Sequence, residues 1–243
     1  MTKKTINILI WVVIFAIAMG LLETAVVIYL RKIYYPDGFN FPLRIFEKDI
    51  LIVELSREIA TIIMLLSIGI LAGRTKLEKF AFFLFSFAIW DIFYYVFLKI
   101  FINWPESLFT WDILFLIPTV WIGPVIAPCI NSLTMLILAI LIIYFTDKNI
   151  KSKFGFTVWA LLIIGSLIII FVFIQDYTAY MTSHFTFSQL LKQENEKEII
   201  KIASKYIPVK FNWALFFIGV AMHLSAILVY YKSTSSTSNT SST

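Results

Sequence analysis

The stretch INILIWVVIFAIAMGLLETAVVIYL, residues 6–30, decides the fold class of this chain. It contains one charged residue, Glu23, and it is longer than the roughly 20 apolar residues that a helix needs to cross a bilayer core. Two lysines precede it and Ala16–Ala18 imitates a cleavage site, as in a signal peptide. The apolar run continues well past these alanines, whereas a signal peptide has an apolar region of only about 7–15 residues. We therefore expect an uncleaved first membrane helix.

The composition of the whole chain agrees with a membrane environment. Hydrophobic residues make up 60%, charged residues 14%, and the mean hydropathy is +0.89. Soluble domains are about half apolar and a quarter charged. The net charge of +5 comes largely from lysines that flank apolar segments, so it does not indicate nucleic-acid binding. The single Cys129 excludes an intrachain disulfide and is expected to be a packing thiol.

The apolar segments predict an all-α, polytopic integral membrane helix bundle with about six transmembrane helices. The expected spans are 6–30, 50–72, 77–102, 113–145, 156–175 and 212–231. Residues 1–232 are expected to form a single transmembrane domain. The tail 233–243 contains only Ser, Thr and Asn and is expected to be disordered.

The fourth segment is too long for one simple span and contains Pro118, Gly123, Pro124 and Pro128. Proline removes a backbone donor and clashes with the preceding helical turn. We expect a Pro/Gly-broken segment, with a short re-entrant turn near 111–123 and a regular helix from about Pro124. Irregular backbone is not tolerated against lipid, so this stretch must be buried in protein or line a wet cavity.

Lysine and arginine placement predicts that both termini are cytoplasmic in a cell membrane. The short, acid-poor segments on that side hold Lys3, Lys4, Arg74, Lys76, Lys79, Lys148, Lys151, Lys153 and Lys232. The opposite side carries the longest connection, which contains an amphipathic segment at about 186–207. This segment could lie on the membrane surface or cover the bundle as a lid, and the pattern favours the surface helix.

Ionisable residues inside membrane spans are costly and are candidates for function. At about 1.5 Å per residue, Glu23 lies about 10 Å, Glu54 about 6 Å and Glu58 about 12 Å below the extracytoplasmic ends of their helices, and Asp91 and His223 lie about 16 Å deep. All of these depths lie between the extracytoplasmic surface and the middle of the membrane, which predicts a polar pocket in the extracytoplasmic half. The candidate substrate-binding residues are Glu23, Glu54, Arg57, Glu58, Asp91, Tyr94, Asp112 and His223.

Glu54 and Glu58 are four residues apart and share a helix face, while Arg57 can approach Glu54. A guanidinium between carboxylates offsets part of the cost of burial. An Arg–Glu network that only fixes helix packing explains these residues as well as a functional site does.

Asp91 has several possible roles because Tyr94 shares its helix face and charged residues are near. It could carry a proton or act as a general base, but an ion pair with Arg57 or Lys99 is the favoured interpretation. Asp112 lies at the start of the fourth segment, where an acidic side chain could instead cap a helix.

A metal site is not expected. Glu-x-x-x-Glu differs from the Glu-x-x-His of di-iron bundles, and the two histidines form no cluster. His223 alone is more often a hydrogen-bonded core residue than a ligand. No phosphate-binding glycine loop and no Gly-x-Ser-x-Gly are present, and the sequence identifies no cofactor.

Three functions remain open. A small-solute transporter or permease is narrowly preferred because interrupted helices mark transporter sites. The alternatives are a membrane-embedded enzyme acting on a lipid or outer-leaflet substrate, and a non-catalytic membrane subunit or assembly factor. A cavity sealed from the cytoplasm, with Glu54, Glu58 and Asp91 converging on one point, favours the enzyme. A path to both faces favours transport, and charges fully paired in a dry core favour the subunit. The partner is the lipid bilayer, with a homodimer or a membrane partner left open.

Overall fold

Six long helices form the body of the protein. The computed structural model describes residues 1–150, 154–190 and 196–240. Within these ranges, six helices are long and apolar enough to cross a membrane, which is compatible with a multi-pass membrane protein. These helices are α1 (Lys3–Tyr34), α2 (Lys48–Ala72), α3 (Lys76–Ile102), α4 (Ile126–Asp147), α5 (Phe156–His184) and α8 (Trp213–Thr240). The predicted helical bundle of six spans is therefore supported, with α1 and α5 longer than expected.

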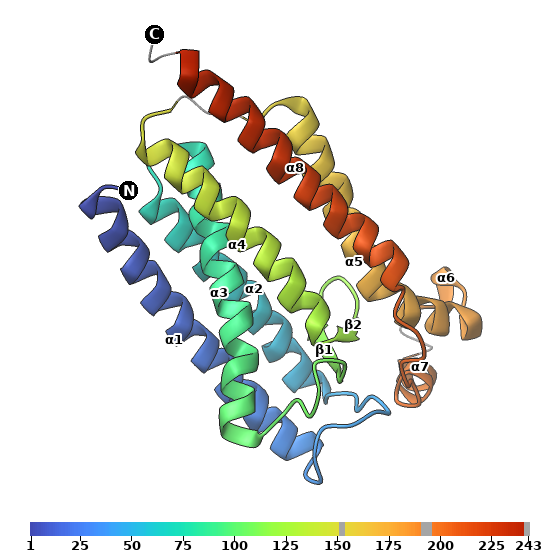
Figure 1. The fold of residues 1–243 in the computed structure, drawn as a ribbon. Coiled ribbons are helices and arrows are strands. Elements are labelled where there is room, and N and C mark those ends of the chain that lie inside the picture. Colours follow the sequence, from blue (N-terminus) through green and yellow to red (C-terminus); the bar gives the residue numbers. More distant parts are fainter. Residues whose placement is uncertain (151–153, 191–195, 241–243) are drawn as a thin grey trace.

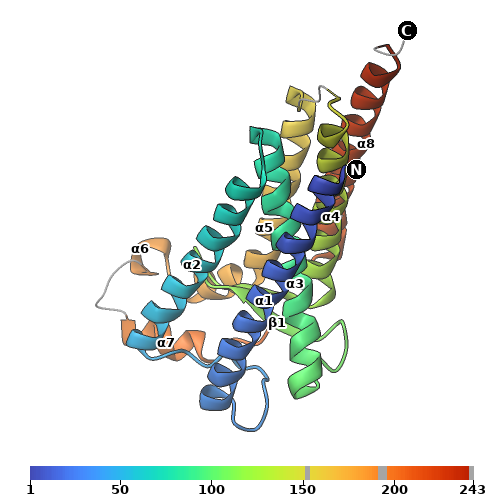
Figure 2. The same ribbon diagram turned by 90° about the vertical axis from the view of Figure 1, so that its left-hand side faces the viewer.

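The bundle has two distinct ends (Figure 1). Both chain termini lie at one end, which we call the terminal end. The other end carries strands β1 (Trp111–Phe115) and β2 (Trp121–Pro124) and the short helices α6 (Phe187–Leu190) and α7 (Glu196–Ala203), and we call it the hairpin end. Figure 2 shows that α7 and the loop after α1 lie together at this end.

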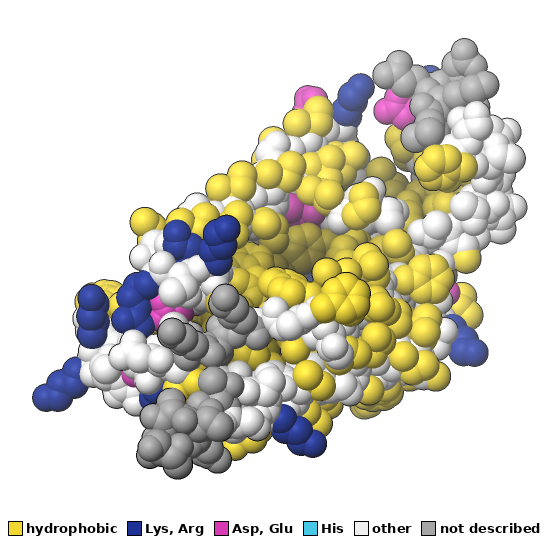
Figure 3. All heavy atoms as spheres, turned by 90° about the horizontal axis from the view of Figure 1, so that it is seen from above, with side chains coloured by type: hydrophobic (Ala, Val, Ile, Leu, Met, Phe, Trp, Pro, Cys, Tyr) yellow, Lys and Arg dark blue, Asp and Glu magenta, His cyan; other side chains and the backbone are white. Residues whose placement is uncertain are grey.

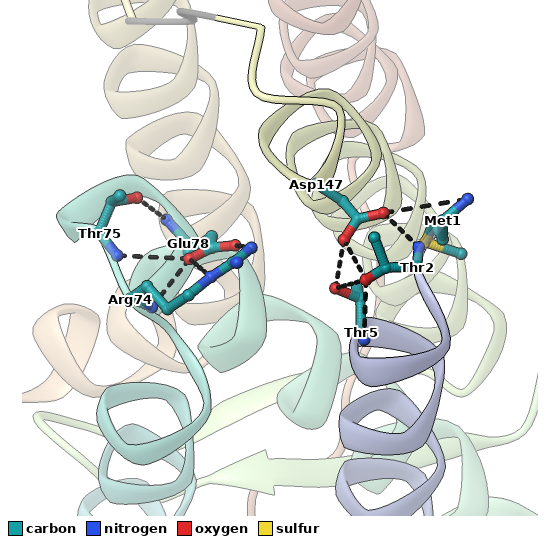
Figure 4. Close-up of polar contacts among 7 residues, drawn as sticks. All are labelled: Met1, Thr2, Thr5, Arg74, Thr75, Glu78 and Asp147. Atoms are coloured by element: carbon teal, nitrogen blue, oxygen red, sulfur yellow. Dashed lines mark hydrogen bonds and ion pairs between the residues drawn. The ribbon is translucent and has the colours of Figure 1, made fainter.

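Polar contacts between the connections hold the terminal end (Figure 4). Thr75 and Glu78 form a reciprocal capping box at the start of α3, and Arg74 donates to the Glu78 carboxylate at 2.7 Å. Two backbone N–H groups that the first helical turn leaves without helical partners are thereby satisfied. These contacts fix the tight turn that joins α2 to α3.

A second polar cluster fixes the first helix against α4 (Figure 4). The Asp147 carboxylate accepts hydrogen bonds from the Thr2 backbone N–H at 2.6 Å, from the Thr2 hydroxyl at 2.8 Å and from the Thr5 hydroxyl. The Met1 amino group lies 3.9 Å from the same carboxylate. Two helix ends that are far apart in the sequence are therefore joined at the terminal end.

Helix α3 is the centre of one group of helices. It packs against α1, α2 and α4, and the close approach of α2 depends on glycine. A Cβ atom at Gly69 would lie 2.8 Å from the Lys79 carbonyl oxygen, and one at Gly73 would lie 2.4 Å from the Lys79 backbone nitrogen. Larger residues at these positions would push α2 away from α3.

Helices α5 and α8 form a second group that meets the first through α4. Gly165 of α5 and Gly219 of α8 face each other, since a Cβ atom on Gly219 would lie 2.9 Å from the Gly165 carbonyl oxygen. Small residues at such positions let helix backbones pack closely inside a membrane.

The fourth segment begins as a β-hairpin. Strands β1 and β2 are antiparallel, with Trp111 opposite Pro124 and Ile113 opposite Ile122, and the register shifts before Phe115. Regular helix begins at Ile126, close to the expected start. The irregular stretch at 111–123 thus contains a two-stranded sheet, and the role of Pro and Gly in interrupting the helix stays a prediction.

The structure describes two further predicted segments in part, the amphipathic segment and the C-terminal tail. The amphipathic segment 186–207 contains α6 and α7, while 191–195 lie outside the described residues. Helix α8 continues to Thr240, into the tail for which the sequence predicts disorder, and 241–243 lie outside the described residues.

Candidate functional site

A cavity of about 350 Å³ lies in the hairpin half of the bundle. Side chains from α1, α2, α3, α4, α5 and α7, from the hairpin and from the loop after α1 line it. Seven of the eight predicted site residues are among them: Glu23, Glu54, Arg57, Glu58, Asp91, Tyr94 and Asp112. The structure therefore brings together carboxyl groups from three different membrane helices and from β1.

Arg57 connects two of these carboxylates. Its guanidinium forms an ion pair with Glu23 of α1 and a second one with Glu54 of its own helix, at 2.8 Å from Nη2 to Oε2. The Thr61 hydroxyl also donates to Glu23, at 3.4 Å. The expected Arg–Glu contact within α2 thus extends to α1 and forms a three-residue cluster.

Glu58 does not join this cluster through an ion pair in the part of the chain that is described. Both of its carboxylate oxygens accept from the backbone N–H of Leu116, at 3.0 and 3.1 Å. Leu116 follows β1, so the hairpin directs a backbone donor at a carboxyl group on α2. The side chain of Glu58 is buried, with 6% of the residue exposed.

Asp91 accepts a hydrogen bond of 2.7 Å from the Ser132 hydroxyl of α4. The ion pair expected with Arg57 or Lys99 is wrong, because Arg57 faces the two glutamates and the Lys99 ammonium donates to the Pro105 carbonyl oxygen at 2.9 Å. Asp91 and Glu58 are thus cavity carboxyl groups without a basic partner among the described residues.

Asp112 pairs with Arg31 of α1, at 2.9 Å from Nη2 to Oδ1, instead of capping α4, which begins only at Ile126. The Arg31 guanidinium also lies over the rings of Trp104, at 3.8 Å, and Phe39, at 4.4 Å. Burial raises the pKa of the Asp112 carboxyl, and the positive charge of Arg31 opposes this shift. This contact joins α1 to the hairpin and closes one side of the cavity.

Aromatic and aliphatic side chains form most of the remaining wall. Phe87 packs against Trp90, which packs against Phe115, and Phe115 in turn packs against Trp121. Tyr94 of α3 contributes to the same wall. The lining therefore combines a carboxyl-rich region with an extended apolar surface, which is the usual character of a pocket for a small organic molecule.

His223 is the predicted site residue that the cavity lining does not include. It lies on α8, and its Nε2 is 3.1 Å from the Ser166 hydroxyl of α5. A Cβ atom at Gly165 would lie 2.7 Å from the His223 ring. The alternative interpretation of a hydrogen-bonded packing histidine fits this position better than a role in the pocket.

Comparison with known proteins adds no family to this description. No family model, curated protein or solved structure matches the chain. Function must therefore be argued from the cavity itself.

The cavity is closed toward the terminal end. Phe87 and Ser132 are among the lining residues nearest the terminal end. Beyond them, a large cluster of buried apolar side chains fills the terminal half. Members of this cluster from four different helices include Val12, Phe85, Ile142 and Ala226. No residue of this buried cluster belongs to the cavity lining within the described part of the chain.

Sequence reasoning missed several contributors to the site. Arg31 follows the first apolar run and is not among the predicted site residues, and Ser132 and Asn131 carry no charge that marks a buried position. Leu116 contributes through its backbone, which no side-chain pattern reveals. Of these four, Arg31 alone gave a usable signal, since an arginine in the last turn of an apolar helix requires a partner.

The chemistry available in the cavity is proton transfer and ionic or hydrogen-bonded recognition. Two carboxyl groups, a serine hydroxyl and an asparagine amide face an apolar space. No group of three or more His, Cys, Asp or Glu side chains in the described ranges is arranged to hold a metal ion. Carboxyl groups alone can act as general acids and bases when they are held within reach of a substrate.

Proposed function

We propose that this chain is a membrane-embedded acid–base enzyme that acts on an amphiphilic molecule bound in the cavity of the hairpin half. The observation that carries the proposal is a cavity closed at one end that contains two carboxyl groups, Glu58 and Asp91, without a basic partner among the described residues. Burying a carboxyl group without a basic partner is costly, so the presence of two such groups in one cavity is better explained by chemistry than by stability.

The two carboxyl groups have different neighbours, as a separate acid and base require. Glu58 of α2 accepts from the Leu116 backbone N–H beside the hairpin, whereas Asp91 of α3 accepts from the Ser132 hydroxyl of α4. One group would deliver a proton to the substrate while the other removes one. Isomerisation, hydration and dehydration can proceed by such transfers without a redox cofactor.

Transport is retained as a second candidate because non-helical backbone lines the cavity. Phe115 and Leu116 belong to an interruption between membrane helices, and interrupted helices commonly form the binding sites of transporters. A transporter would have to open the apolar terminal half in another state. The packing role proposed for a non-catalytic subunit fits the Arg57 cluster but leaves Glu58 and Asp91 unexplained.

The orientation belongs to the same proposal. We place the hairpin end outside the cytoplasm, because the short basic connections lie at the terminal end. The enzyme would then receive its substrate in the outer half of the membrane.

Lipid profiles of cells test the enzyme. Cells that express the wild type are compared with cells that express Glu58→Gln or Asp91→Asn, and total lipid extracts are analysed by liquid chromatography, which separates isomers of equal mass, followed by mass spectrometry. The wild type is expected to convert one amphiphile into a product of equal mass, or of a mass that differs by one water. Glu106→Gln is the matched control, because Glu106 is exposed and does not line the cavity.

Identical lipid profiles for the wild type and both variants would contradict the enzyme. Transport is tested separately by placing cysteine at Ser86, a buried α3 residue on the terminal side of the cavity, in a Cys129→Ser background. A membrane-impermeant maleimide added at the terminal end is expected not to react. Labelling from that side would show a path through the closed half and favour the transporter.

A further inference from the structure

The loop after α1 and helix α7 border the cavity at the hairpin end, and a second hollow of about 640 Å³ lies between them. The loop after α1 contributes Leu43 to the lining, and α7 contributes Ile199, Ile200 and Ala203. The backbone N–H of Leu43 donates to the carbonyl oxygen of Tyr206 at 3.1 Å, so the loop and the segment after α7 are joined. We call residues 35–46 together with 196–206 the roof.

The roof is attached to α5 by buried contacts. The Tyr206 hydroxyl donates to the Asp176 carboxylate at 2.6 Å, and the Tyr180 hydroxyl donates to the Ile202 carbonyl oxygen at 3.1 Å. Burial and the neighbouring carboxylate raise the pKa of Tyr206, which keeps its hydroxyl as a donor. A molecule that approached the cavity along the bundle axis would meet this roof and the polar loop residues of its hollow, such as Asp37 and Asn40.

Helices α2 and α5 both border the cavity without packing closely against each other. Helix α2 packs mainly against α3, and α5 packs mainly against α8, so each has its principal neighbour elsewhere. Leu51 and Glu58 of α2 and Phe173 and Tyr177 of α5 nevertheless line the same cavity. Figure 3 shows a hollow on the upper surface of the molecule, walled by hydrophobic side chains and with an acidic side chain inside it.

The charges inside the cavity favour a cationic group. Five acidic side chains and three arginines line it. Arg57 faces two of the acids, Arg31 faces Asp112, and Arg44 lies over the Tyr35 ring in the roof, 5.7 Å from its centroid. Glu58 and Asp91 are the two acidic lining residues that form no ion pair within the described residues. The Asn131 side-chain oxygen is buried and has no donor within the described residues, so a further acceptor is present. Aromatic faces such as that of Trp90 also attract cations.

We propose that an amphiphile with a protonated amine head group enters the cavity sideways from the bilayer, between α2 and α5, and places the amine against Glu58 and Asp91. The gap between α2 and α5 at the cavity border, the hydrophobic walls of the hollow in Figure 3 and the excess of carboxyl groups support this assignment. It rests on the proposed function, since it names the substrate class of the same cavity. The apolar part of the molecule would remain against the flank and the lipid.

A binding experiment tests the head group. The purified protein is placed in nanodiscs of zwitterionic lipid, and dodecylamine, dodecanol and dodecanoate are titrated separately, with partitioning into empty nanodiscs subtracted. Dodecylamine is expected to bind the wild type about tenfold or more tightly than dodecanol, as a charge-assisted contact implies. Glu58→Gln and Asp91→Asn are each expected to remove most of this preference, whereas Glu106→Gln keeps it.

A second measurement tests the route. Leu51→Trp places a large ring at the α2 border of the cavity, while Ile52→Trp places the same ring on the exposed side of that helix. Dodecylamine is expected to associate several-fold more slowly with Leu51→Trp than with Ile52→Trp. Equal association rates in two folded variants would overturn sideways access.

Other results separate this inference from the enzyme proposal. Equal binding of dodecylamine and dodecanol, or a preference for dodecanoate, would overturn the cationic head group. Selective binding of dodecylamine together with unchanged lipid profiles would support the site and contradict the enzyme. Circular dichroism and size-exclusion profiles show whether each variant is folded.

Discussion

Replacing Arg57 with methionine tests the buried cluster that joins α1 to α2. The substitution keeps an unbranched apolar chain but leaves Glu23 and Glu54 without their shared partner. Their side chains are only 12% and 5% exposed, so water can compensate little. Removing one partner of a buried ion pair costs about 3–5 kcal/mol. Because the Arg57 side chain is 21% exposed, we expect a loss near the lower limit, about 3 kcal/mol.

The matched control is Arg74→Met at the terminal end. Arg74 also pairs with a buried glutamate, but its own side chain is 55% exposed, and Glu78 keeps hydrogen bonds from the Arg74 and Thr75 backbone N–H groups when the guanidinium is removed. Because these donors remain, the same substitution should cost less there, about 1 kcal/mol. The free energy of unfolding of both variants is measured by reversible denaturation in mixed micelles of mild detergent and dodecyl sulfate.

A rescue variant separates charge from packing. Changing Glu23 and Glu54 to glutamine in the Arg57→Met background removes the unpaired charges and should recover most of the lost stability. This follows because replacing a whole buried ionic cluster by neutral groups is often neutral or stabilising. The reasoning would be refuted if Arg57→Met were no more damaging than Arg74→Met, or if the rescue variant stayed as unstable as Arg57→Met.

Three further predictions concern other contacts. Gly219→Leu should force α8 away from α5 and lower stability by about 1–3 kcal/mol or more, measured by thermal unfolding in detergent. Ser132→Ala should leave the fold intact, cost about 0.5–1.5 kcal/mol, and reduce product formation less than Asp91→Asn, because it removes only a donor to that carboxyl group. Tyr206→Phe should lose its hydrogen bond to Asp176, loosen the roof and speed proteolysis near residue 200, with no change in bundle stability beyond about 1 kcal/mol.

The common location of four acidic side chains could be predicted because helix geometry is regular. A fixed rise per residue places Glu23, Glu54, Glu58 and Asp91 at similar depths once the span ends are known. The structure places all four in the lining of one cavity. His223 had a similar depth but lies between α5 and α8, because depth says nothing about which way a helix faces.

The contacts made by the fourth segment were beyond sequence reasoning. Short apolar runs such as 111–115 fit a strand or a helix equally well, so periodicity could not identify the hairpin. The pairing of Asp112 with Arg31 depends on how that hairpin folds back on α1. The bonds from Leu116 to Glu58 and from Ser132 to Asp91 use a backbone group and a neutral side chain, neither of which leaves a pattern in the sequence.

Carbodiimide labelling tests most directly whether Glu58 and Asp91 share one cavity. Dicyclohexylcarbodiimide reacts with carboxyl groups buried in membranes, and its adduct is bulky relative to a space of about 350 Å³. Intact-mass and peptide mass spectrometry should find molecules modified at either residue, with doubly modified molecules far rarer than the product of the two single frequencies. Double modification at the frequency expected for independent sites would mean that the two side chains face separate surroundings.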